Sequence, residues 1–273
     1  MPICYNNGMK VCFFALAVVA LAGCASLSEE SDAAVSWKGR TVAFLGDSIT
    51  DPRQKNEIYW QYLERSMGIQ AHVYAVSGYR WRHMLTMAEK MKATDGENVD
   101  AILIFTGTND YNGGVPLGEW WSVTNEVANY NGTDRTMPRR YPDFSADTVR
   151  GRINATMRYL KTNWPDAQIV LMTPIHRAYA CFSEKNIQPP ESFPNRNGVY
   201  LEDYIRAIRE AADIWSVPLI DLYRESGLLP TEDVYAKCFR FNGGKDMLHP
   251  NAEGHRRLAE LIRLRLLALP LYR

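Results

Sequence analysis

The chain has no excess of charge of either sign. Its 273 residues include 31 Lys and Arg and 31 Asp and Glu, so the formal net charge is zero. No run of like charge occurs that could follow a phosphate backbone. We therefore expect no nucleic-acid partner. Hydrophobic residues make up 46% of the chain, which is ordinary for a globular protein and argues against disorder of the main body.

The sequence also lacks the short motifs that commonly bind metals and cofactors. It contains no HExxH zinc motif, no CxxC pair, no GxGxxG dinucleotide-binding motif and no Walker A loop. The two glycines before Lys245 lack the rest of a phosphate-binding loop. We therefore expect neither a metal nor a cofactor.

Long apolar runs are absent except at the N-terminus. The run that begins at Val11 is shorter than the roughly 20 residues that a membrane-spanning helix needs. It follows Lys10, and small residues lead from it to Cys24, an order that is typical of a signal peptide. The sequence therefore predicts a processed N-terminus.

The end of this segment, "LAGC", resembles the lipobox of a bacterial lipoprotein. The resemblance implies cleavage before Cys24, acylation of Cys24 and a lipid anchor in the cell envelope, on the periplasmic face or the cell surface. Residues 1–23 are then the signal peptide, and the small and polar residues 24–38 are a flexible tether. Met1 and Met9 both stay open as the start of the chain.

Cysteine is scarce in the rest of the chain. Of the five cysteines, only Cys181 and Cys238 lie beyond the predicted lipidation site. An oxidising periplasm would allow them to form a disulfide, and two buried free thiols are the alternative. The sequence leaves both alternatives open.

From residue 41 onward, short apolar runs alternate with segments of helical periodicity. Strands are predicted at 41–46, 71–78, 99–106, 167–175 and 217–223, and helices at 56–68, 80–93, 146–165, 199–216 and 252–269. Strands separated by helices pair in parallel and carry helices on both faces. The predicted fold is one domain, residues 39–273, a three-layer α/β/α sandwich with about five parallel strands.

Two unusually long connections interrupt this alternation. Residues 111–145 and 176–198 are too long for plain links between a strand and a helix, so we predict that they are insertions. The first follows the third strand and is expected to lie over the edge of the sheet where ligands bind.

Ser48 follows the first predicted strand directly, after a turn at Gly46. A serine in this place is either a nucleophile or the N-cap of the next helix. A nucleophile needs a base, and "DMLHPNAEG" near the C-terminus offers His249 with Asp246 three positions before it. Such a pair can take the proton of a serine hydroxyl.

Four short blocks, "FLGDSITD", "AVSGYR", "GTND" and "DMLHPNAEG", occur in order over residues 42–254. With them the chain resembles an SGNH hydrolase of the GDSL esterase/lipase superfamily. The resemblance implies a flavodoxin-like sheet and an esterase with Ser48 as nucleophile, His249 as base and Asp246 as its partner. It also implies an oxyanion hole of the Ser48 N–H, the Gly78 N–H and the Asn109 side chain.

Aromatic and basic residues near the predicted site suggest the substrate. Exposed rings beside polar groups suit sugars, and the alternative is that the rings only pack the insertions onto the domain. The candidate substrate contacts are Tyr79, Arg80, Trp120, Trp121 and His176. We predict a carbohydrate esterase that removes acetyl or similarly small acyl groups from a glycan, its ester substrate, at the cell envelope.

Two alternatives stay open. One is a lipase, lysophospholipase or thioesterase, which needs a long apolar groove. The other is a lipoprotein that binds glycans without turnover, although the complete Ser, Gly, Asn, Asp and His set favours an enzyme.

Overall fold

The computed structural model describes residues 36–272. The predicted signal peptide, Cys24 and most of the tether lie outside the described residues. The core is a five-stranded sheet of order β2-β1-β3-β6-β9 in which all neighbours are parallel. Its strands are β1 (Thr41–Gly46), β2 (Gln70–Ala75), β3 (Ala101–Phe105), β6 (Gln168–Met172) and β9 (Leu219–Ile220).

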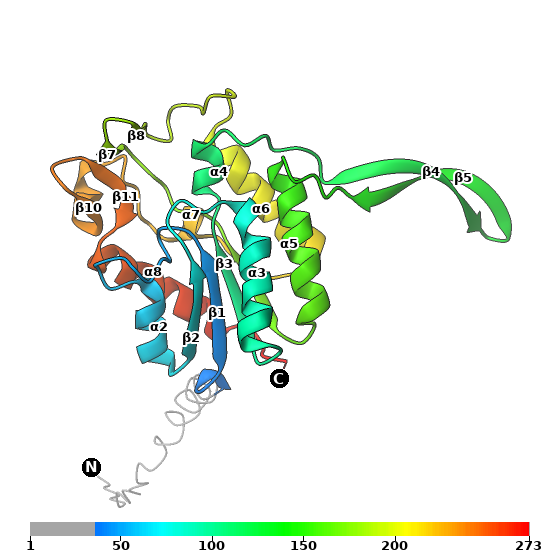
Figure 1. The fold of residues 1–273 in the computed structure, drawn as a ribbon, viewed down its shortest axis with the longest axis horizontal. Coiled ribbons are helices and arrows are strands. Elements are labelled where there is room, and N and C mark those ends of the chain that lie inside the picture. Colours follow the sequence, from blue (N-terminus) through cyan, green and yellow to red (C-terminus); the bar gives the residue numbers. More distant parts are fainter. Residues whose placement is uncertain (1–35, 273) are drawn as a thin grey trace, which may run out of the picture.

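Helices cover both faces of this sheet (Figure 1). One face carries α3 (Trp81–Asp95), α5 (Val149–Asn163) and α6 (Leu201–Trp215), and the other carries α2 (Tyr59–Met67) and α8 (Ala252–Leu267). Along β1, Ala43 and Leu45 pack into the first layer of side chains, whereas Val42 and Phe44 pack into the second. This alternation follows from the period of two in a strand. The predicted three-layer sandwich is confirmed.

The predicted strand at 217–223 is wrong in length. It is paired only over Leu219–Ile220, because Asp221 then caps the short helix α7 (Leu222–Glu225). The side chain of Asp221 accepts the N–H of Arg224, which turns the chain out of the sheet.

A second sheet lies beside the carboxyl end of β1 and joins segments that are far apart in sequence. Its order is β10-β11-β7-β8, from β10 (Phe239–Phe241), β11 (Asp246–Pro250), β7 (Ala180–Ser183) and β8 (Asn186–Gln188). The remaining small elements are α4 (Thr108–Asn112) and the 3-10 helix η1 (Asp233–Cys238). Asp246 and His249 are therefore held on a paired strand, although the sequence around them shows no strand-like alternation. The second insertion supplies two of the strands.

The first insertion does not cover the sheet edge. It forms a hairpin of β4 (Trp121–Tyr130) and β5 (Thr133–Pro142), which projects away from the domain (Figure 1). Polar and charged residues occupy both faces of the hairpin, and nearly all of its side chains are exposed. Neither face is apolar enough to pack on the domain, which explains why the predicted position is wrong.

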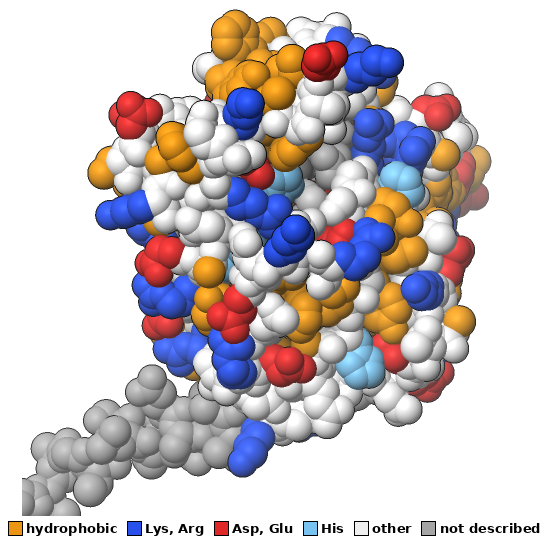
Figure 2. All heavy atoms as spheres, turned by 60° about the vertical axis from the view of Figure 1, so that its left-hand side comes forward, with side chains coloured by type: hydrophobic (Ala, Val, Ile, Leu, Met, Phe, Trp, Pro, Cys, Tyr) orange, Lys and Arg blue, Asp and Glu red, His pale blue; other side chains and the backbone are white. Residues whose placement is uncertain are grey.

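Three further features concern the surface and the thiols. Cys181 and Cys238 are both free, as in the second predicted alternative, but only Cys238 is buried, whereas Cys181 is half-buried. Within residues 36–272, no helix has the length and apolar character of a membrane span. On the face that Figure 2 shows, Lys and Arg are interspersed with Asp, Glu and uncharged side chains.

Candidate active site

Ser48 lies in a single tight turn at the carboxyl end of β1. Gly46 makes the turn possible, because a Cβ there would lie 2.9 Å from the carbonyl oxygen of Phe105 and closer still to Thr50. The turn closes with a hydrogen bond from the Asp51 N–H to the Asp47 carbonyl. The next helix has its N-cap at Ile58. The interpretation of Ser48 as a helix cap is therefore wrong.

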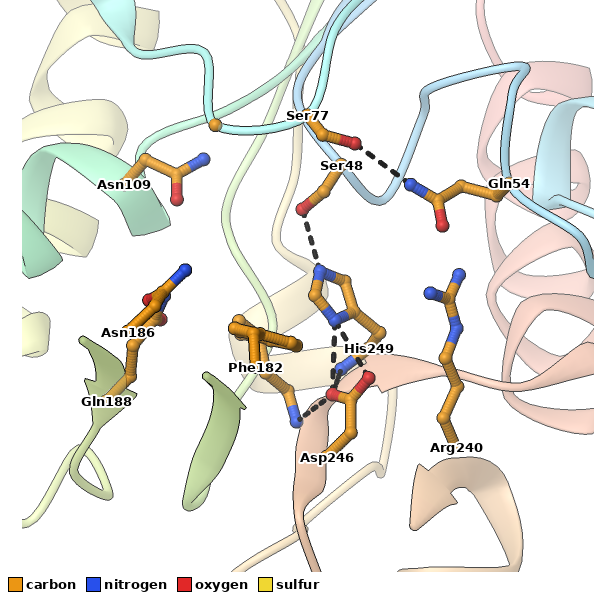
Figure 3. Close-up of a pocket in the computed structure, with 12 residues that line it drawn as sticks. Ser48, Gln54, Ser77, Asn109, Phe182, Asn186, Gln188, Arg240, Asp246 and His249 are labelled. Carbon is orange, nitrogen blue, oxygen red and sulfur yellow. Dashed lines mark hydrogen bonds and ion pairs between the residues drawn. The ribbon is translucent and has the colours of Figure 1, made fainter. Parts of the chain in front are cut away.

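The side chain of Ser48 meets the predicted His and Asp (Figure 3). Its Oγ lies 2.9 Å from Nε2 of His249, and Nδ1 of His249 lies 3.1 Å from each carboxylate oxygen of Asp246. A carboxylate only accepts, so Nδ1 carries the proton and Nε2 is free to accept the hydroxyl proton of Ser48. This arrangement can generate a serine nucleophile.

Asp246 is held as an anion in this position. Burial by itself would raise its pKa, but hydrogen bonds from the ring and the backbone N–H of His249, together with the charge of Arg240, outweigh burial and lower the pKa below its usual value. The same carboxylate accepts the backbone N–H of His249 at 3.0 Å and of Leu248 at 3.3 Å. The three-residue spacing thus closes a local turn that presents the imidazole toward Ser48.

Three residues around Ser48 have hydrogen-bond donors available for a ligand. The backbone N–H groups of Ser48 and Gly78 donate to no other group of residues 36–272. The Asn109 amide uses one N–H on the Tyr79 carbonyl at 2.9 Å, which leaves its second N–H available. All three residues line the same cavity, in which Figure 3 shows Ser48 and Asn109. Such a set can stabilise an oxyanion.

Buried carboxylates fix the loops that carry these donors. Asp51 accepts the backbone N–H of Ser77 at 2.7 Å and its hydroxyl at 2.8 Å, next to Gly78. Burial opposes the charge of Asp51, but hydrogen bonds from Arg53 and Ser77 hold its pKa well below the usual range. Asp110, beside Asn109, accepts the backbone N–H of Trp81 at 3.0 Å. Both loops are therefore tied to the body of the domain.

The carboxyl group of Asp47, next to Ser48, is buried. Burial raises its pKa to about 7, and the nearby charge of Asp110 adds to the rise, although the N–H of Ile49 opposes it. The folded protein therefore holds a proton that the unfolded chain releases near pH 3.8. The free energy of unfolding should accordingly fall as the pH rises from about 4 to about 7.

Replacement of Asp47 by Asn should remove this contribution. Asn keeps an oxygen that can accept the Ile49 N–H, but it does not ionise. Between pH 5 and pH 8, we expect the free energy of unfolding of Asp47→Asn to fall less than that of the wild type, by on the order of a few kcal/mol. Urea denaturation at both pH values measures this difference. Asp166→Asn, at an exposed position, is the matched control. An equal fall in wild type and Asp47→Asn would contradict the assignment.

The cavity in front of Ser48 is small, and most of the residues that line it are of polar types. It has a volume of about 340 Å³, near the lower end of the range for small-molecule sites. Its lining residues are Ser48, Gln54, Ser77, Gly78, Asn109, Phe182, Asn186, Gln188, Arg240, Asp246, Leu248 and His249. Among residues 36–272, no group of three His, Cys, Asp or Glu is arranged to hold a metal ion.

None of the five predicted substrate contacts is among these lining residues. Trp120 is only 8% exposed, and its indole N–H donates to Glu210 at 2.6 Å. Trp121, at the start of β4, packs against the same hydrophobic core. Both rings pack the first insertion onto the domain, which was the predicted alternative to sugar binding. The expectation that both tryptophans lie at the substrate is therefore wrong in this structure.

The side chains of the other three candidates contact neighbouring residues and do not enter the cavity. The Tyr79 ring stacks on His83 with 4.2 Å between ring centroids, and the Arg80 guanidinium lies against Gly113. His176 makes a 2.5 Å contact with Glu191 and lies against the Tyr223 ring. Each lies near the sheet edge but outside the cavity wall.

Sequence reasoning missed several residues of the cavity wall. The sequence gives some indication of a few of them and none of the others. Ser77 directly precedes Gly78 in the second block, and Phe182 lies in the second insertion. Gln188 is brought in by β8 and is held by the buried Arg177 at 2.8 Å. Arg240 lies in the cavity wall only because β10 pairs with β11, and no local sequence pattern predicts that pairing.

Comparisons with known proteins identify the family of the chain and relatives of its fold. A family model described as "GDSL-like Lipase/Acylhydrolase family" matches residues 44–257. A protein from Lactobacillus plantarum has a solved structure with 26% identity and a TM-score of 0.65, over 86% of this chain and 99% of that one. A structure described as a possible lipase from Chitinophaga pinensis DSM 2588 shares the fold at 18% identity, with a TM-score of 0.61 over 84% and 99% of the two chains. A search of curated proteins finds no significant match.

The residues that the family model matches include strands β3 to β9. They also include the segments that carry Ser48, Gly78, Asn109 and His249. The match therefore covers well over half of the chain and both halves of the candidate site. The chain belongs to the GDSL-like lipase/acylhydrolase family, which makes it a hydrolase by class.

Proposed function

We propose that the protein is a serine esterase in which Ser48 attacks the carbonyl carbon of a carboxylic ester. The observation that carries the proposal is the 2.9 Å contact between Ser48 Oγ and His249 Nε2, with Asp246 behind the imidazole. His249 takes the hydroxyl proton as Ser48 forms a bond to the carbonyl carbon, and then gives it to the departing alcohol. Water, activated by His249, releases the acid and restores Ser48.

Negative charge develops on the carbonyl oxygen in both steps. The N–H groups of Ser48 and Gly78 and the free N–H of Asn109 can stabilise that charge. Because Asp51 and Asp110 fix the loops that carry Gly78 and Asn109, these donors should need little rearrangement during the reaction. A single such donor contributes about 3–4 kcal/mol to transition-state stabilisation in other hydrolases.

We propose an acylated glycan as the substrate, with acetyl or a similarly small acyl group. The polar wall supports this choice, because the amides of Gln54, Asn186 and Gln188 can each donate to and accept from sugar hydroxyls. Phe182 contributes one aromatic face, 5.3 Å from the His249 ring. The tryptophans of the first insertion no longer support the proposal.

A lipase, lysophospholipase or thioesterase is the alternative enzyme. The family description favours it, but Phe182 and Leu248 are the only large apolar side chains among the lining residues. A long acyl chain would need a longer apolar groove than these two residues form. A glycan-binding lipoprotein without turnover is the alternative from another class.

The acyl-chain dependence of hydrolysis separates these functions. We expect the purified full-length chain, in detergent, to cleave p-nitrophenyl acetate and butyrate and to release acetate from acetylated polysaccharides. Rates that increase beyond a chain of about eight carbons would favour a lipase. Glycan binding with no hydrolysis of any ester would favour the non-catalytic lipoprotein.

We also propose that Cys24 carries a lipid that anchors the protein in the bacterial cell envelope. The support is the "LAGC" sequence and the apolar run before it. Metabolic labelling with radioactive palmitate should label the wild type, and Cys24→Ala should lose the label. Equal labelling of both would refute the proposed anchor.

A further inference from the structure

Arg240 is a charged residue in the cavity wall that the hydrolytic mechanism leaves without a role. It lies on β10, which pairs with the strand that carries Asp246 and His249. Figure 3 shows its guanidinium beside His249, below Gln54 and across the cavity from Asn186 and Gln188. It is the only Lys or Arg among the residues that line the cavity.

The guanidinium of Arg240 makes no hydrogen bond or close ion pair within residues 36–272, although the charge of Asp246 lies near enough to act on it. Its Nε and Nη2 are buried and make no hydrogen bond, and it forms no ion pair with a carboxylate in that part of the chain. Asp246, the nearest carboxylate in the wall, is instead engaged by His249 and by backbone N–H groups. Arg240 as a whole is half-buried, but its Nε and Nη2 have lost contact with water without gaining a hydrogen bond, which costs free energy.

We propose that Arg240 binds a carboxylate of the substrate, so that the preferred ester is an anionic one. The planar guanidinium fork fits the two oxygens of a carboxylate. A single guanidinium matches a group of one negative charge, and the wall provides no second Lys or Arg for a phosphate dianion. The position beside His249 places the anion close to the ester that Ser48 attacks.

The carboxylate can belong to either half of the ester. A uronic acid residue would carry it on the alcohol side, and a dicarboxylic acyl group would carry it on the acyl side. Burial lowers the pKa of Arg240, although the charge of Asp246 opposes this. A substrate anion would act in the same direction as Asp246 and would satisfy the unused N–H groups. The inference rests on the proposed esterase function and specifies its substrate class.

Two matched pairs of esters test the proposal with the full-length chain. For the alcohol side, the pair is the methyl glycosides of mono-O-acetyl glucuronic acid and mono-O-acetyl glucose. For the acyl side, the pair is monoethyl succinate and ethyl 4-methylpentanoate, which replaces the carboxylate by a branched alkyl group of similar shape. The readout is the ratio of kcat/KM, anionic over neutral, within each pair.

We expect the wild type to prefer the anionic ester in one pair, and that pair identifies the source of the carboxylate. Arg240→Gln should lower this ratio about 10- to 100-fold, the range for a lost hydrogen bond to a charged group. Arg240→Lys keeps the charge without the fork and should give an intermediate ratio. Lys55→Gln removes the same charge at an exposed position next to Gln54 and should change the ratio less than about twofold.

Thermal melting of each variant shows whether it is folded. If Arg240→Gln is not folded, the ratio measured for Arg240→Lys provides the test instead. A wild type without preference in both pairs, or an unchanged ratio in the Arg240 variants, would overturn the proposal while leaving the esterase function intact. If no ester is hydrolysed, calorimetric binding of glucuronate and succinate decides. Binding that is lost in Arg240→Gln supports the anion site without the esterase, and absence of binding to the wild type overturns it.

Discussion

Replacement of Ser48 by Ala should abolish ester hydrolysis. The substitution removes only the hydroxyl that donates to His249, and the donors at Gly78 and Asn109 stay in place. In serine hydrolases, loss of the nucleophile costs about 10⁴-fold or more in kcat, while binding contributes a residual rate. We expect such a loss in kcat for p-nitrophenyl acetate, measured as release of p-nitrophenol.

A serine elsewhere on the surface provides the control for this experiment. Ser66→Ala removes a hydroxyl from the exposed end of α2 and should keep the wild-type rate. Ser48→Ala should melt within a few degrees of the wild type, because the lost hydroxyl lines the cavity and is not part of the packed hydrophobic core. Hydrolysis by Ser48→Ala at more than about a tenth of the wild-type rate would be incompatible with a serine mechanism.

Replacement of Asp246 by Asn should reduce kcat by about 10⁴-fold, because it changes which ring nitrogen of His249 carries the proton. Asn can still accept the backbone N–H groups of Leu248 and His249 through Oδ1, so the turn should persist. Its NH₂ group, however, would donate to Nδ1 of His249 and drive the proton onto Nε2. An imidazole with a proton on Nε2 cannot accept the Ser48 hydroxyl. The rate of p-nitrophenol release from p-nitrophenyl acetate measures the loss in kcat.

The effect of Asp246→Asn should appear in kcat with little change in KM, because Asp246 acts through His249 and not on the ester. Asp203→Asn, on the outer face of α6, is the matched control and should retain full activity. A loss that appeared mainly in KM would indicate that Asp246 binds substrate directly, and the proposed role would then be incorrect.

The fold could be predicted because its signals are local and repeated. In β1, Val42 and Phe44 alternate with Ala43 and Leu45, and both sets are apolar because both faces of the strand are covered. The same logic located the four other parallel strands and the five large helices. The length of β9 was missed because a single cap at Asp221 ends it, and that cap depends on its three-dimensional surroundings.

The meeting of Ser48 with His249 was predictable for a different reason. Parallel strands bring their carboxyl ends to one edge, so the loops after β1, β2 and β3 must converge. The separation of 201 positions between Ser48 and His249 is no obstacle once that topology is fixed. The resemblance to a known family supplied the pairing, and the geometry agrees with it.

The substrate-facing residues could not be predicted from the sequence. Trp120 looked exposed because polar residues surround it in the chain, but Glu210 on α6 offers its indole N–H a partner at the protein core. Arg240 and Gln188 reach the cavity only through the sheet β10-β11-β7-β8. These short strands carry weak periodicity, and their pairing is set by tertiary contacts.

The central claim is that Ser48 is a nucleophile activated by His249. Treatment of the full-length chain with a fluorophosphonate, followed by peptide mass spectrometry, tests it most directly. We predict one phosphonyl group per chain, on the peptide that contains Ser48, and much slower labelling of His249→Ala. Labelling of a different residue, or continued ester hydrolysis after Ser48 is fully modified, would contradict the account.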